Sequence, residues 1–157
     1  MDDALDLERI VELIDKLNSL SSDYAITGQD AAFLYTPDII PSFFTLPIEV
    51  LCVAETNMQD IRRIDKNDLP LSMQGFYDSM LKERRTIAFH GVNVKLVAPE
   101  FLVAQSYCSN EYHGRVARRL ISFSDPDIER VRILTKGFPN SNEIHRRIYE
   151  ASYELTR

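Results

Sequence analysis

The sequence contains no hydrophobic run that approaches the length of a membrane-spanning helix, which argues against a membrane protein. Its first ten residues, MDDALDLERI, are acidic and amphipathic, so they match neither a secretory signal nor a transit peptide. We therefore expect a cytoplasmic protein. The length of 157 residues suits one domain, or one domain with a helical extension, and is sufficient to bury a hydrophobic core.

Cysteine and histidine are also scarce, and their positions match no known type of metal site. The two cysteines are Cys52 and Cys108, and the three histidines are His90, His113 and His145. No Cys or His spacing fits a zinc site, and the histidines form no local catalytic pattern. Cys52 lies within the apolar run IEVLCVA, where a buried thiol is the expected state.

The chain lacks the positive charge that a large nucleic-acid-binding surface needs. The net charge is −6, and it is distributed unevenly. Residues 1–110 contain 9 Lys and Arg against 17 Asp and Glu, a balance of −8, whereas residues 111–157 contain 9 against 7, a balance of +2. The C-terminal part is therefore rich in arginine without being strongly basic, which leaves open only a small nucleic-acid contact.

Hydrophobic periodicity predicts an alternation of helices and strands along the first hundred residues. Leu7, Ile10, Ile14 and Leu17 recur at helical spacing, which predicts a helix over residues 4–20. The apolar run over residues 46–54 is typical of a central strand buried on both faces. The other expected elements are a strand at 24–27, helices at 29–35, 57–64 and 70–84, and a hairpin at 86–97.

The pattern from residue 99 onward is entirely helical. Pro99 suits the first turn of one helix, and a second helix is expected over residues 113–123. Asp125 and Pro126 predict the start of the next helix, with the aspartate as its cap and the proline in its first turn. A final helix is expected to run to residue 155.

Two segments, YAITGQDAAFLY from Tyr24 and GVNVKLVAPEFLVAQ from Gly91, resemble the nucleotidyltransferase superfamily. The similarity covers roughly residues 5–120 and is strongest to the minimal nucleotidyltransferases and the AbiEii-type toxins, which are small bacterial branches. It implies an α/β (α+β) fold, with a small mixed sheet flanked by helices. We expect a nucleotidyltransferase-like core over residues 1–110 and a C-terminal helical extension, residues 111–157, packed on that core.

The resemblance also implies where phosphate would bind. In the superfamily, a glycine and a small neighbouring residue hold the nucleotide phosphates through backbone N–H groups at a helix start. Gly28 matches that glycine, and Gln29 stands where a second glycine or a serine is usual. Gly28 and Gln29 are therefore the expected phosphate-binding residues, although the bulk of Gln29 could obstruct a phosphate.

The metal-binding acids of the superfamily are mostly replaced in this chain. Two or three carboxylates on adjacent strands hold the divalent ions that bridge the triphosphate. Glu49 matches the second acid and is the one expected catalytic and metal-binding residue. Pro47 stands at the position of the first acid, and the candidates for the third position, Asn93 and Lys95, are not acids.

Three functions remain open at this point. We expect a catalytically degenerate member that acts as a binding or regulatory module, in a setting such as a toxin–antitoxin pair, with a protein partner and no cofactor. The alternative is an active transferase that uses Mg²⁺ and ATP to transfer a nucleotide to a protein, an RNA or a small molecule. A third reading is an unrelated α+β interaction domain, which would be favoured if the strands at 24–27 and 46–54 were not neighbours.

The residues expected to contact a nucleic-acid partner are Arg115, Arg118 and Arg119, which fall at helical spacing on one side of a helix. A helix surface with ordinary ion pairs explains these arginines at least as well. Neither a membrane nor a large nucleic-acid partner is expected.

Overall fold

The computed structural model describes residues 7–20, 23–36, 46–52, 58–108 and 113–155, and along 113–116 and 152–155 it describes the backbone alone. The strands are β1 (Tyr24–Ile26), β2 (Ile48–Cys52), β3 (Ile61–Ile64), β4 (Arg85–Phe89) and β5 (Val92–Leu96). The helices are α1 (Leu7–Asn18), α2 (Gly28–Leu34), the 3₁₀ turn η2 (Lys66–Asp68), α3 (Leu71–Gln74), α4 (Tyr77–Lys82), α5 (Pro99–Ser106), α6 (His113–Ser124), α7 (Ile128–Thr135) and α8 (Ser141–Leu155).

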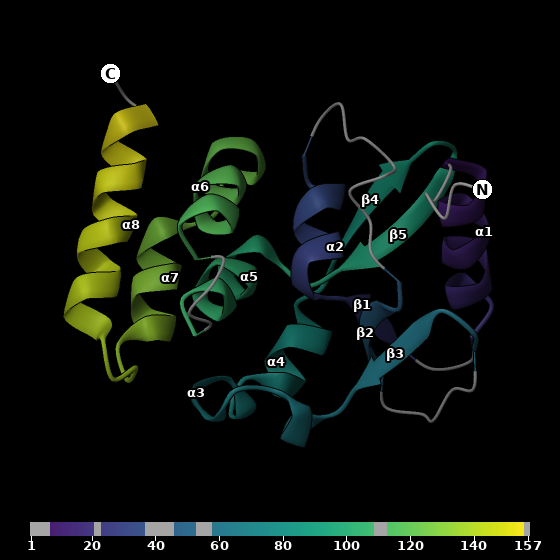
Figure 1. Ribbon diagram of the computed structural model, residues 1–157, viewed down its shortest axis with the longest axis horizontal. Coiled ribbons are helices and arrows are strands. Elements are labelled where there is room, and N and C mark those ends of the chain that lie inside the picture. Colours follow the sequence, from purple (N-terminus) through teal and green to yellow (C-terminus); the bar gives the residue numbers. More distant parts are fainter. Residues whose placement is uncertain (1–6, 21–22, 37–45, 53–57, 109–112, 156–157) are drawn as a thin grey trace.

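The strands form one mixed sheet in the order β3-β2-β1-β5-β4, with β1 at its centre (Figure 1). Strand β1 runs antiparallel to β2 and parallel to β5, while β3 runs parallel to β2 and β4 antiparallel to β5. All residues of β1 are buried, as expected for a strand that has a neighbour on each side. The predicted mixed sheet flanked by helices, the hairpin and the pairing of the first two strands are confirmed.

Helix α1 and the C-terminal helices lie at opposite ends of the molecule, with the sheet and α2 between them (Figure 1). The apolar side of α1 is buried at Ile10, Leu13, Ile14 and Leu17, as its periodicity predicts. The end of α1 is fixed to the sheet by Asn18. Its side-chain amide donates to the Asn93 carbonyl over 2.6 Å, and its side-chain oxygen accepts the Tyr24 hydroxyl, also over 2.6 Å.

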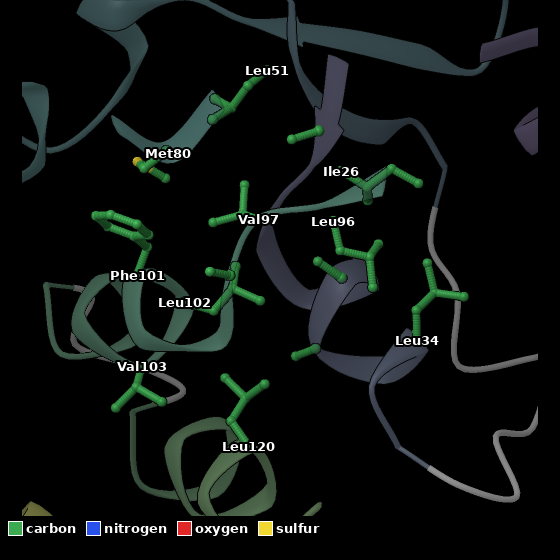
Figure 2. Close-up of a cluster of buried hydrophobic side chains, with 14 of the residues drawn as sticks. Ile26, Leu34, Leu51, Met80, Leu96, Val97, Phe101, Leu102, Val103 and Leu120 are labelled. Carbon is green, nitrogen blue, oxygen red and sulfur yellow. The ribbon is translucent and has the colours of Figure 1, made fainter. Parts of the chain in front are cut away.

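A single cluster of buried hydrophobic residues extends from Ile10 in α1 to Ala151 in α8. Figure 2 shows part of it, in which Leu51 of β2 and Val97, directly after β5, lie near Met80 of α4 and Phe101 of α5. Because the cluster crosses residue 110, α6 to α8 share one core with the sheet. The domain boundary at 110 and 111 stays a prediction.

The buried carboxylate of Glu100 connects α5 to the segments on either side of it. One oxygen forms an ion pair with Arg85 of β4 at 3.2 Å, and the other accepts the backbone N–H of Asp127 at 3.0 Å. Asp127 is the residue before α7, so one side chain joins the hairpin, α5 and the C-terminal helices. A buried charge requires partners of this kind.

Three local predictions are wrong, each for an identifiable reason. The helix predicted over residues 57–64 is wrong, because Ile61–Ile64 is the edge strand β3, whose backbone is satisfied by pairing with β2. Residue 57 itself lies outside the described residues. The helix predicted over 70–84 is divided into α3 and α4 around Gly75. Asp125 does not cap α7, because it has a φ of 48°; the cap is Asp127, whose side chain accepts the N–H of Arg130.

Candidate functional site

The centre of the candidate site is the junction between β1 and α2. Gly28 opens α2 with a φ of +73°, a left-handed conformation that glycine adopts without strain. The preceding residue, Thr27, is buried and does not cap the helix with its side chain. Its hydroxyl instead donates to the side-chain oxygen of Gln105 on α5, at 3.1 Å. The junction is therefore held in place by a residue 78 positions further along the chain.

The structure brings Gly28 and Glu49 together. The Thr27 N–H donates to the Glu49 carbonyl oxygen over 3.0 Å, which continues the β1–β2 ladder by one residue. A Cβ atom built on Gly28 would lie 3.5 Å from Oε2 of Glu49 and 3.8 Å from its Cδ. The carboxylate thus lies directly beside the open face of the glycine, in the space where the resemblance expects a phosphate. Whether either residue binds a ligand stays a prediction.

Glu49, Thr27 and Val97 lie side by side in a row across the sheet. Because Ile26 pairs with Val50 and with Leu96, the next residue, Thr27, lies between Glu49 on one side and Val97 on the other. The N–H of Val97 donates to the Ile26 carbonyl at 3.0 Å, which supports this register. The position across the sheet from Glu49 is therefore occupied by a fully buried valine.

The two candidates for the third acid position lie further down β5 and have other contacts. Lys95 is in line with Ala25 rather than Thr27, and its Nζ lies 5.8 Å from the centre of the Tyr24 ring. Asn93 lies two residues before Lys95 on β5, and its backbone carbonyl accepts a hydrogen bond from the side-chain amide of Asn18. Neither residue is in line with Glu49.

The structure also places the other residues that the sequence analysis named, and one acidic neighbour of Gly28. Gln29 is exposed, and Pro47 is exposed immediately before β2, where the sequence predicted the strand to begin. Asp30, in the first turn of α2, is buried. On α6, Arg118 and Arg119 are exposed, and the side chain of Arg115 lies outside the described part.

The electrostatic surroundings of Glu49 are simple. No hydrogen bond or ion pair joins its carboxylate to another residue in the described part of the chain. Its neighbour in the parallel strand β3 is the exposed Arg62, whose side chain projects from the same face of the sheet. Among the described residues, no three His, Cys, Asp or Glu side chains are grouped to hold a metal ion. Glu49 alone can offer one ligand, with phosphates and water completing the shell around Mg²⁺.

Sequence reasoning missed the contributions of Gln105, Val97 and Tyr35 to the site. Tyr35 donates its hydroxyl to the Val97 carbonyl at 2.8 Å, and burial raises the pKa of this phenol well above its usual range. No local motif marks these residues, because each acts through a partner far away in the sequence. No helix of the described chain is both long and apolar enough to span a membrane.

Comparison with known proteins identifies the fold. No protein-family model and no curated protein sequence matches the chain. A solved structure does: the crystal structure of an antigenic nucleotidyltransferase-like protein from Paracoccidioides brasiliensis, with a TM-score of 0.51 and 16% sequence identity. The match covers 96% of this chain and 90% of that one. At this identity the similarity shows a nucleotidyltransferase-like fold and leaves the activity open.

Proposed function

We propose that this protein is a binding or regulatory module with a nucleotidyltransferase-like fold, that it has lost metal-dependent nucleotidyl transfer, and that its partner is a protein. The observation that carries the proposal is the row Glu49–Thr27–Val97. Bridging two metal ions at this level of the sheet requires carboxylates on more than one strand. Val97, the residue directly after β5, supplies no ligand atom from its side chain.

The position of the Glu49 carboxylate supports the same proposal. It lies beside Gly28, so a phosphate bound against the glycine would be close to a negative charge. Two like charges about 4 Å apart repel by about 4 kcal/mol at the effective dielectric constant of a protein surface. In the absence of a bound cation, the site therefore disfavours phosphate and favours a basic or neutral group of a partner.

The contact between Glu49 and Gly28 is also the observation that favours an active transferase as the second candidate function. If Mg²⁺ bound Glu49, the repulsion would become an attraction, and the phosphates of ATP would complete the coordination shell next to Gly28. In that case, Glu49 and Gly28 would hold the metal and the phosphates. The two candidate functions thus predict opposite effects of the Glu49 charge on phosphate binding.

The test is ATP binding, measured by calorimetry with and without Mg²⁺, for the wild type and Glu49→Gln. The proposal expects no Mg²⁺-dependent binding in the wild type and unchanged or tighter binding of free ATP in the variant, since a repulsive charge has been removed. Glu12→Gln, an exposed position on α1, is the control for the same change in net charge. Mg²⁺-dependent ATP binding that Glu49→Gln abolishes and Glu12→Gln preserves would establish the transferase instead.

A further inference from the structure

Strand β4 forms one edge of the sheet, and β5 is its neighbour in the ladder (Figure 1). Its five residues, Arg85–Phe89, pair with β5 without a bulge. Lysines, prolines and bulges commonly prevent an edge from pairing with another chain, and β4 contains none of them. Its one charged side chain, that of Arg85, is paired with Glu100 of α5. In the part of the chain that the structure describes, this edge is therefore open to a further strand.

The hairpin turn decides which backbone groups of β4 face that edge. The turn at residues 90–91 has φ values of 46° and 86°, and two positive values are typical of a type I′ turn. Such a turn makes its two flanking residues, Phe89 and Val92, a hydrogen-bonded pair. Bonded and non-bonded pairs alternate along an antiparallel ladder, so Thr86 and Ala88 direct their N–H and C=O groups away from β5.

The contacts of β5 agree with this alternation. The carbonyl of Asn93 accepts a hydrogen bond from α1, and the N–H of Val97 donates to β1. The odd-numbered positions of β5 thus face away from β4, and the even-numbered positions face it. Among the described residues, none forms a hydrogen bond with the outward backbone groups of Thr86 and Ala88. Backbone groups of this kind are a ready template for strand pairing.

A second copy of β4 fits this edge in one particular register. If two copies run antiparallel with Ile87 opposite Ile87, Thr86 of each copy faces Ala88 of the other, and all their outward N–H and C=O groups find partners. A register centred on Thr86 would place Ala88 opposite Arg84, whose N–H already donates to a carbonyl of α4. A register centred on Ala88 would place Thr86 opposite His90, which lies in the turn with a φ of 46°.

The side chains of β4 also suit the register centred on Ile87. Ile87 is half-buried and packs against the core, so two Ile87 side chains that meet across the axis would cover the rest of their apolar surface. Arg85 would lie opposite Phe89 of the other copy, so the arginines of the two strands do not face each other. The opposite edge differs, because β3 has Arg62 and Arg63 at its centre, and a copy paired there would bring like charges together.

We propose that the β4 edge binds a second copy of this chain and forms a two-fold symmetric dimer with one continuous sheet. The two β4 strands run antiparallel, and the symmetry axis passes beside Ile87. Each copy contributes the same residues to the interface, as two-fold symmetry requires. The proposal needs no ligand and is independent of the Gly28–Glu49 site, so its failure would leave the proposed function unchanged.

The first experiment is sedimentation equilibrium of the full chain at concentrations up to about 1 mM, where we expect dimers. Ala88→Pro removes the outward N–H and leaves the bonds to β5 in place. One donor is then lost from each copy, so the dimer dissociation constant is expected to rise roughly 5- to 150-fold. Ala88→Val keeps the N–H and is the control, with an expected change within about twofold.

The second experiment tests the register. Ile87→Glu and Ile87→Lys each place two like charges across the axis, so each variant alone is expected to dimerise at least about tenfold more weakly. An equal mixture of the two is expected to form a heterodimer, because opposite charges then meet. In a Cys108→Ala background, Ile87→Cys should form a disulfide-linked dimer under mild oxidation. Ala88→Cys, which would lie opposite Thr86, should not.

A chain that stays monomeric at about 1 mM would overturn the proposal. A dimer that Ala88→Pro and Ile87→Glu leave unchanged would also overturn it, and equal cross-linking of Ile87→Cys and Ala88→Cys would refute the register. Circular dichroism of each variant checks that it is folded. Because Ala88 is exposed, its variants keep the test decisive even if a charge at Ile87 unfolds the chain.

Discussion

Replacing Gly28 by alanine tests the geometry of the candidate site directly. Gly28 has a φ of +73°, and an L-residue in the left-handed region costs about 1–2 kcal/mol. The added methyl group causes no clash, because its nearest neighbour would be Oε2 of Glu49 at 3.5 Å, an ordinary contact distance. Alanine also lowers the conformational entropy of the unfolded chain, which offsets about 0.4–1 kcal/mol of that cost. We therefore expect the free energy of unfolding to fall by about 1 kcal/mol.

Two other glycines provide matched controls. Gly91, at φ +86°, has the same strained conformation and nothing within 4 Å of an added Cβ, so Gly91→Ala is expected to cost about the same as Gly28→Ala. Gly75 also has open space, but its φ is −66°, so Gly75→Ala is expected to be neutral or stabilising by up to about 1 kcal/mol. The difference between the first two variants isolates the contact with Glu49.

Urea denaturation followed by far-UV circular dichroism measures these differences; the chain contains no tryptophan for a fluorescence readout. A Gly28→Ala variant more than about 3 kcal/mol less stable than Gly91→Ala would be outside the cost of backbone strain. Such a result would show that Glu49 leaves no room beside the glycine. A stabilising Gly28→Ala substitution would refute the left-handed conformation itself.

Two further predictions concern stability. Glu100→Ala should lower the free energy of unfolding by about 2–3 kcal/mol in urea denaturation, because the Asp127 N–H and the Arg85 guanidinium lose their acceptor. Glu100→Gln should lower it by less, because the amide keeps one acceptor oxygen. Burial raises the pKa of the Cys108 thiol to about 11, so its contribution to stability is full below about pH 9 and is lost as the pH rises through 11. Urea midpoints across this range should therefore fall more steeply for the wild type than for Cys108→Ala, and parallel curves would contradict the assignment.

Local sequence patterns predicted most of the helices and strands because these elements depend on local periodicity. The apolar spacing of α1 gave its buried face, and the alternation in residues 86–97 gave the β4–β5 hairpin. The edge strand β3 was mistaken for a helix, because its four residues become a strand only through backbone pairing with β2. The cap of α7 was misplaced by two residues, since Asp125 and Asp127 are equally good caps in sequence terms.

The sequence by itself determined the order of the elements, the glycine at the β1–α2 junction and the small number of acids available to the site. Only the tertiary structure decided which residues meet there. Glu49 reaches Gly28 because β1 and β2 are antiparallel neighbours, and Val97 lies opposite because β5 is parallel to β1 in one particular register. A shift of one residue in either register would change all of these neighbours, and register is fixed by burial of the whole sheet rather than by any local motif.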